Sequence, residues 1–263
     1  MIHDRLDQRM KAYEATVQTK LVRRMPVAIR IDGKAFHTFT KGLHRPFDGI
    51  LRAAMNNTML LLAKNIQNCC FAYCQSDEIT LILKDWDTLE TDAWFDNKVQ
   101  KLTSISASMA TLYFNQEFRR LAEDEIFTWK NSLVPQSVEI QERVNKYHQT
   151  LRNCIQKGAM FDARCFNIPR EEVTNLIYWR QIDAIRNSVQ ACGQSMFSHK
   201  ELMNKSTNDI KAMLFDKGYN WDTLPSEAQH GTCCYKTEDG WFIDSHMPVL
   251  KGEGRALLDN IIA

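Results

Sequence analysis

Two acidic residues in this sequence stand where a chain could hold a metal ion. Asp32 and Gly33 directly follow the β-branched run 27–31, and Asp77 lies in a polar break between two apolar runs. If the fold brings the two carboxylates together, they repel each other and are costly to bury, and a divalent cation relieves that conflict. Magnesium prefers one or two carboxylates together with phosphate oxygens and water. We therefore expect Asp32 and Asp77 to ligate magnesium, with the backbone carbonyl of Gly33 as a further ligand.

This pair of carboxylates favours chemistry at phosphorus. Two magnesium ions about 3.5–4 Å apart can bracket an in-line phosphoryl displacement. Glu78 follows Asp77 directly, and we include it with Asp32 and Asp77 as a candidate catalytic residue. The alternative is that Asp32-Gly33 and Ser76-Asp77 are ordinary polar turns. The sequence holds no GxxxxGK[ST], GxGxxG or GxSxG motif, so phosphate-loop, dinucleotide and serine-hydrolase sites have no support.

The elements that must position these residues follow the order βαββαβ. Apolar and β-branched runs predict strands at 27–31, 69–74, 79–83 and 160–166. Apolar stripes predict helices at 46–64 and over much of 91–120. Pro46 suits the opening turn of the first of these helices. This is the order of a ferredoxin-like α+β fold, which nucleotide polymerase palms share. Its first and third strands are neighbours, about 4.8 Å apart. Asp32 and Asp77 should therefore meet at one sheet edge, on the face that the helices leave free.

The remaining segments are predicted to be mainly helical. We expect a charged helix at 4–20, a polar helical insertion at 121–157 that Pro135 interrupts, and two or more helices within 170–217. A hairpin of 232–237 and 241–243 is predicted to turn at Asp239-Gly240. Residues 1–263 are predicted to form a single domain, with a palm core at 26–167 and a C-terminal helical and hairpin part at 170–263.

The composition is that of a soluble globular chain. Of the 263 residues, 44% are hydrophobic and 25% are charged, and the formal net charge is +1. The eight cysteines form no CxxC pair, so we expect buried, reduced thiols. No apolar run reaches the length of a membrane span, and the first residues show no apolar signal core, so we expect a cytoplasmic protein.

A net charge near zero means that any binding of nucleic acid must come from a local basic patch. Five basic residues flank the first predicted strand and its following loop: Lys20, Arg23, Arg24, Lys41 and Arg45. They could form a phosphate-binding patch, and the alternative is an ordinary solvated surface.

Four motifs resemble one known family. Residues 30–37 (RIDGKAFH) and 73–78 (YCQSDE) resemble the metal and nucleotide motifs of the tRNA-histidine guanylyltransferase family. Residues 161–164 (FDAR) and 179–183 (WRQID) resemble its later motifs, in the same order. The similarity spans roughly residues 4–235.

The resemblance implies an enzyme with a polymerase-like palm that extends tRNA at its 5′ end, in the 3′–5′ direction, and usually assembles as a tetramer. It implies two magnesium ions per active site, held by Asp32, Asp77 and the Gly33 carbonyl, and ATP or GTP as the activating nucleotide. It also implies triphosphate contacts from Asp32, Gly33, Lys34, Ala35, Phe36, His37, Arg45, Ser76 and Asp77. For the tRNA we expect contacts from Arg23, Arg24, Lys41, Arg186 and Asn187.

One position departs from the pattern of the guanylyltransferases proper. Ile185 occupies the place of the histidine in their His-Ile-Asn-Asn segment, which resembles the guanylyltransferase-like branch of bacteria, archaea and viruses. We therefore expect templated repair of 5′-truncated tRNA. The alternative for Ile185 is a core position, with Arg186 or Asn187 making the polar contact. Lys205 and Lys211 are both candidates for a further phosphate-binding lysine.

Three other functions remain open from the sequence. The chain could add a single guanosine to tRNA-histidine, or it could be a palm-type enzyme that acts on free nucleotides, such as a cyclase. It could also be a ferredoxin-like RNA-binding module, which should expose aromatic side chains on its central strands for base stacking.

Overall fold

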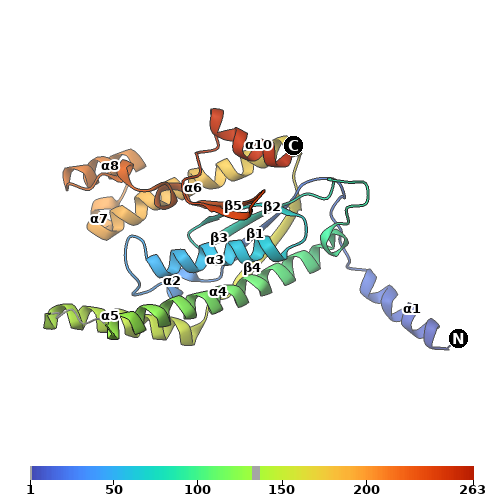
Figure 1. Ribbon diagram of the computed structural model, residues 1–263, viewed down its shortest axis with the longest axis horizontal. Helices are drawn as coiled ribbons and strands as arrows, with labels where there is room; N and C mark the ends of the chain where they lie inside the picture. Colours follow the sequence, from blue (N-terminus) through green and yellow to red (C-terminus); the bar gives the residue numbers. More distant parts are fainter. Residues whose placement is uncertain (1, 132–136) are drawn as a thin grey trace.

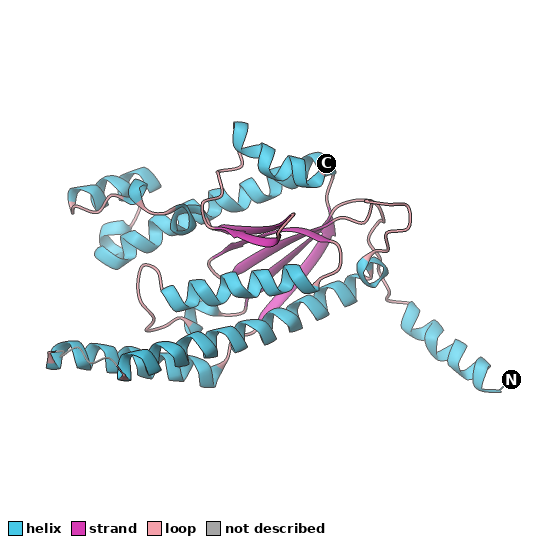
Figure 2. Cartoon of the chain, in the orientation of Figure 1, coloured by secondary structure: helices cyan, strands magenta, loops and turns pink. Residues whose placement is uncertain are grey.

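The computed structural model describes residues 2–131 and 137–263, and it consists of one antiparallel sheet between two layers of helices (Figures 1 and 2). The sheet order is β4-β1-β3-β2-β5-β6. The strands are β1 (Val27–Gly33), β2 (Cys69–Gln75), β3 (Glu78–Leu83), β4 (Phe161–Asn167), β5 (Thr232–Thr237) and β6 (Gly240–Asp244). The predicted βαββαβ core is confirmed, and the β5–β6 hairpin extends it beyond β2.

The helices account for most of the remaining described residues. They are α1 (Ile2–Ala15), α2 (Phe36–Phe39), α3 (Gly49–Asn65), α4 (Val99–Lys130), α5 (Val138–Lys157), α6 (Val173–Met196), α7 (His199–Leu202), α8 (Thr207–Asp216), α9 (Ser226–His230) and α10 (Ala256–Ile262). Short 3-10 turns lie at Trp94–Asn97, Arg170–Glu172, Trp221–Thr223 and Gly252–Arg255. No helix in the described ranges is long and apolar enough to cross a membrane.

One face of the sheet packs against α3 and α4 (Figure 1). Alternate side chains of β1 point to this face, among them Ile29 and Ile31, and both are fully buried. The centre of the layer is a cluster of rings whose neighbouring centroids lie 5.1–5.6 Å apart, formed by Phe36, Phe39, Phe114, Phe118 and Phe161. This aromatic cluster lies between the sheet and the two helices of the predicted palm core.

The opposite face is covered as well, so the prediction that helices leave it free was wrong. Helices α6 and α10 lie over it (Figure 1), and Val173 and Ile177 of α6 pack with Phe71 and Tyr73 of β2. The reason is visible in β2 and β3, which are apolar on both faces and therefore need a second layer. Because Phe71 and Tyr73 are fully buried, they cannot stack on RNA bases, which contradicts the RNA-binding-module alternative.

Two helix boundaries differ from the prediction. Helix α3 begins after Pro46, at Gly49, because Asp48 caps it by accepting a hydrogen bond from the Leu51 N–H at 3.0 Å. The predicted insertion at 121–157 begins inside α4, which continues to Lys130, and α5 then packs along α4. Pro135, which was expected to interrupt this segment, lies outside the described residues.

The outer parts of the chain follow the prediction more closely. Helices α6, α7 and α8 lie within 170–217, and the predicted hairpin is β5 and β6. Helix α1 ends at Ala15, five residues earlier than expected, and projects from the body (Figure 1). All eight cysteines are free thiols, five buried and three half-buried.

Candidate active site

Asp32 and the turn that carries Asp77 lie side by side at one sheet edge. Strand β1 pairs with β3 so that Asp32 is opposite Glu78, and Ser76-Asp77 is the two-residue turn between β2 and β3. The Gly33 N–H donates to the Asp77 carbonyl at 3.1 Å, which fixes the turn against the end of β1. The predicted meeting of the two carboxylates is confirmed, and we call this place the Asp32–Asp77 edge.

The electrostatics of this edge fit a divalent cation. Burial raises the pKa of the Asp77 carboxyl, and the negative charge of Asp32 raises it further. The Ser76 hydroxyl donates to Asp77 at 3.0 Å, but within the described ranges no lysine or arginine pairs with Asp77. The only ion pair of Asp32 in that part of the chain is with the Arg164 guanidinium, with N–O at 4.0 Å. The two carboxylates therefore carry negative charge that the protein leaves largely unpaired.

The described residues contain no group of three or more His, Cys, Asp or Glu side chains that could hold a metal. A magnesium ion at the Asp32–Asp77 edge would therefore need phosphate oxygens and water besides the two carboxylates.

Glu78 differs from the two aspartates in its contacts. Its buried carboxylate accepts from Arg180 Nε at 2.6 Å and lies 3.8 Å from Arg30 Nε. Burial raises the pKa of Glu78, and the Arg180 charge opposes that rise. These contacts point to a positioning role, since they fix the start of β3 beside Asp77; the expected catalytic role of Glu78 stays a prediction.

The segment after β1 approaches the edge with its backbone. A Cβ on Gly33 would lie 2.2 Å from the Phe36 ring, so glycine is required for this close turn. Ala35 is left-handed, with φ of 52°, and starts the short helix α2. Lys34 and His37 are exposed, whereas the Phe36 ring is buried in the aromatic cluster. The nucleotide contact expected of Phe36 can therefore use only its backbone.

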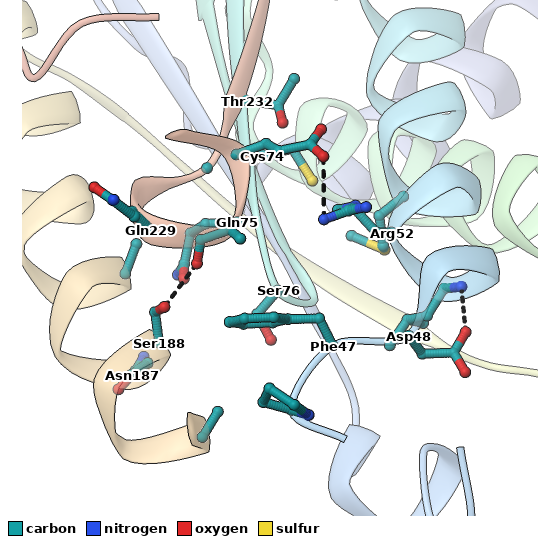
Figure 3. Close-up of a pocket in the computed structure, with 18 of the residues that line it drawn as sticks. Phe47, Asp48, Arg52, Cys74, Gln75, Ser76, Asn187, Ser188, Gln229 and Thr232 are labelled. Carbon is teal, nitrogen blue, oxygen red and sulfur yellow. Dashed lines mark hydrogen bonds and ion pairs between the residues drawn. The ribbon is translucent and has the colours of Figure 1, made fainter. Parts of the chain in front are cut away.

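A cavity of about 270 Å³ opens beside Ser76 (Figure 3). It is enclosed by the loop before α3, the first turns of α3, the end of β2, one side of α6 and the segment around α9. Three predicted site residues line it, namely Arg45, Ser76 and Asn187. The structure thus brings these three together, although they are up to 142 residues apart in the sequence (187 − 45).

Several lining residues were not predicted. The Ser188 hydroxyl donates to the Ala228 carbonyl at 2.6 Å and accepts from Trp221 Nε1 at 2.9 Å, which fixes α6 to the α9 segment. The Gln75 amide lines the cavity at 8% exposure and has no hydrogen-bond partner within the described ranges. A polar residue directly before the Ser76-Asp77 turn was the one sequence signal that could have found Gln75.

The basic residues lie toward the two ends of β1. Lys41 and Arg45 lie in the loop beside the Asp32–Asp77 edge, but Arg23 and Arg24 precede the other end of β1. At about 3.3 Å per residue, the strand holds its ends roughly 20 Å apart. Arg23 pairs with Asp92 at 3.5 Å, and Lys20 pairs with Asp96. The tRNA contacts predicted for Arg23 and Arg24 would have to be far from the carboxylates.

Helix α6 places Ile185 in a half-buried position. Its side chain packs against a third apolar cluster, which contains Val189, as the core alternative predicted. Asp183 accepts hydrogen bonds from Arg186 at 2.5 Å and from Asn187 at 3.2 Å. Asn187 also lines the cavity, and the polar contact expected of Arg186 or Asn187 stays a prediction.

The two lysine candidates differ in their contacts. Lys211 pairs with Asp222 at 2.7 Å and lies 3.8 Å from the centroid of the Trp221 ring. Lys205 is exposed and makes no ion pair with the residues described. Of the two, only Lys211 is engaged in an ion pair among the residues described.

Comparison with known proteins identifies the family. Residues 7–169 match the family Thg1, tRNAHis guanylyltransferase. The structure of a bacterial tRNA(His) guanylyltransferase (Thg1)-like protein in complex with ATP is 35% identical, with a TM-score of 0.81, over 98% of this chain and 99% of that one. A GTP complex of such a protein is 32% identical, with a TM-score of 0.75, over 98% of each chain.

Among curated sequences, a probable tRNA(His) guanylyltransferase of Dictyostelium discoideum is 26% identical over 230 residues, which is 82% of this chain and 77% of that protein. The family match covers the palm core with the Asp32–Asp77 edge, and the bacterial structures extend the likeness over nearly the whole chain. This chain therefore belongs to the tRNAHis guanylyltransferase family and is a nucleotidyltransferase, as its motifs indicated.

Proposed function

We propose that this protein adds nucleotides to the 5′ end of tRNA in the 3′–5′ direction and repairs 5′-truncated tRNA by templated addition. The observation that carries the proposal is the cavity beside Ser76, which offers a place for a nucleoside next to the turn that carries Asp77. The bacterial neighbours in complex with ATP and GTP support a triphosphate as the ligand.

The cavity offers different groups to the two parts of a nucleotide. The base would lie against Phe47 and within reach of the unpartnered Gln75 amide and of Asn187, which can donate and accept hydrogen bonds. The triphosphate would extend past Ser76 toward Asp77, with Arg45 neutralising phosphate charge.

The carboxylates would hold the magnesium of this enzyme. In this proposal the ligands are Asp32, Asp77 and the Gly33 carbonyl, supported by the β1–β3 register and by the Gly33 N–H bond to the Asp77 carbonyl. Bound there with a triphosphate, magnesium would neutralise the phosphates and stabilise charge during an in-line displacement. Glu78, held by Arg180 and Arg30, would keep the Asp77 turn in place.

Two displacements at phosphorus complete the proposed reaction. In the first, a 5′-phosphate oxygen of the RNA attacks the α-phosphorus of ATP or GTP, and pyrophosphate leaves. In the second, the 3′-hydroxyl of an incoming nucleotide attacks the activated 5′-phosphorus, loses its proton, and the nucleoside monophosphate leaves. The side chains at the edge align the attacking and leaving oxygens, which is where most of the acceleration arises in phosphoryl transfer.

Templated addition follows from the departure at Ile185. Because this side chain packs in an apolar cluster, it makes no hydrogen bond to a nucleotide. Loss of the histidine contact weakens discrimination between substrates that differ in that one contact. The incoming nucleotide is then selected by Watson–Crick pairing with the opposite strand of the acceptor stem.

The experiment offers each of the four triphosphates to truncated tRNAs that differ only at the template base. We expect efficient addition of whichever nucleotide pairs, and weaker addition of an unpaired guanosine to full-length tRNA-histidine. Guanosine addition regardless of the template base would contradict repair and indicate the single-guanosine enzyme. Turnover of free nucleotides without any RNA product would indicate the cyclase alternative. The tetramer implied by the resemblance remains a proposal, which light scattering of the purified protein would test.

A further inference from the structure

Helix α6 exposes a stripe of side chains on the side that does not line the cavity. Trp179 is 51% exposed and Ile182 is 48% exposed, and Arg186 follows one turn later with a largely exposed guanidinium. Positions i, i+3 and i+7 lie on one side of a helix. By contrast, Ala184, Asn187, Ser188 and Ala191 of the same helix face the cavity.

The stripe begins next to the carboxylates. The Arg180 and Arg30 guanidinium carbons lie 4.5 and 5.7 Å from the centroid of the Trp179 ring. Arg30 is two residues before Asp32 on β1, on the same face of the sheet, and is paired in register with Arg164 of β4. The exposed Arg164 guanidinium reaches 4.0 Å from Asp32. We call Trp179, Ile182, Arg186 and Arg164 the Trp179 surface.

The chemistry of this surface suits a nucleobase with its phosphate. Exposed bases of RNA are bound by stacking on aromatic rings and on guanidinium planes, and phosphates by arginine. The Trp179 surface has an indole with two guanidinium groups against it, and two further exposed arginines, Arg164 and Arg186. The acidic partners of Arg164 are Asp162 and Asp32, and a cation held by Asp32 would release Arg164 toward an anion.

We propose that the Trp179 surface binds the open end of the tRNA acceptor stem, with Trp179 stacked on the terminal base. The proposal rests on the function proposed above and adds where the RNA lies. Cavity and Trp179 surface are on opposite sides of α6, and the Asp32–Asp77 edge is adjacent to both. A nucleotide in the cavity and an RNA end on Trp179 would meet at the carboxylates.

The test is the affinity of the full chain for an acceptor-stem hairpin RNA with a recessed 5′ end, measured by fluorescence anisotropy. We expect Trp179→Ala to raise the Kd for this RNA about tenfold, and Trp179→Phe, which keeps a ring, to raise it less than about threefold. The control is Phe215→Ala, at an exposed aromatic of α8, which should leave the Kd unchanged.

A second measurement separates stacking from a structural role. The affinity of Trp179→Ala for ATP without RNA and its oligomeric state should equal those of the wild type. Equal RNA affinity of Trp179→Ala and wild type would overturn the proposal and leave the enzyme function intact. A changed oligomeric state would overturn it too, because the surface would then be an interface between copies. No RNA binding by the wild type would end both proposals.

Discussion

The two faces of the sheet have different roles in this enzyme. The face under α3 and α4 is dry and apolar, with Phe114 at the centre of five phenylalanine rings. The face under α6 is apolar only in part. Toward β1 and β4 it carries Arg30, Glu78 and Arg180 in buried ion pairs that lead to Asp32. One face supplies a rigid support, and the other presents charge at the edge of that support.

The two faces also contribute differently to the stability of the fold, because one buries apolar rings and the other buries ion pairs. Burying an aromatic side chain stabilises the fold through its removal from water and its close packing. A buried ion pair gains little net stability, because desolvation of both charges offsets their attraction. The Arg180–Glu78 pair is therefore better understood as a device that holds the Asp77 turn than as a source of stability. Three sets of substitutions test this division of roles.

The largest effect is expected on the apolar face. Phe114→Ala removes a fully buried ring and should lower the free energy of unfolding by about 3–5 kcal/mol. Phe127→Ala, at a 70% exposed position of the same helix, is the matched control and should change it by less than about 0.5 kcal/mol. Urea denaturation measures both. Similar effects of the two substitutions would show that the ring cluster is not the main support of the sheet.

The next effect is on activity and not on folding. Asp32→Ala and Asp77→Ala should each lower nucleotide addition by more than about a hundredfold, since even changes one shell outside a metal site cost about 10–100-fold. The fold should survive, because each substitution relieves repulsion between carboxylates. The exposed Asp124→Ala is a control for loss of a carboxylate elsewhere. Near-wild-type turnover in either variant would end the two-carboxylate site.

The smallest effect should appear in both measurements. Arg180→Met leaves Glu78 buried with only Arg30 nearby, and should destabilise the fold by about 1–3 kcal/mol. If Arg180 acts by positioning, the magnesium concentration for half-maximal activity should also rise. Adding Glu78→Gln removes the unpaired charge, so the double variant should recover stability but not magnesium affinity. An unchanged magnesium requirement in Arg180→Met would leave the pair a purely structural role.

Local sequence patterns were enough for the elements and for the carboxylates. The β-branched run before Asp32 and the polar break at Ser76-Asp77 predicted a strand end and a hairpin turn, since turn and strand preferences act over a few residues. The order βαββαβ then placed the two aspartates together without any long-range information, because it fixes which strands are neighbours.

Only the tertiary structure decided which distant groups meet. Arg180 reaches Glu78 across 102 residues, and the cavity is assembled from four separate segments of the chain. The two-sided burial of β2 and β3 was visible as apolar runs, but a pattern of burial does not name the element that covers it. Likewise, basic residues on both sides of β1 looked close in the sequence, and the extended strand between them holds them apart. Hydrophobicity specifies that a side chain is buried, and only packing selects its partner.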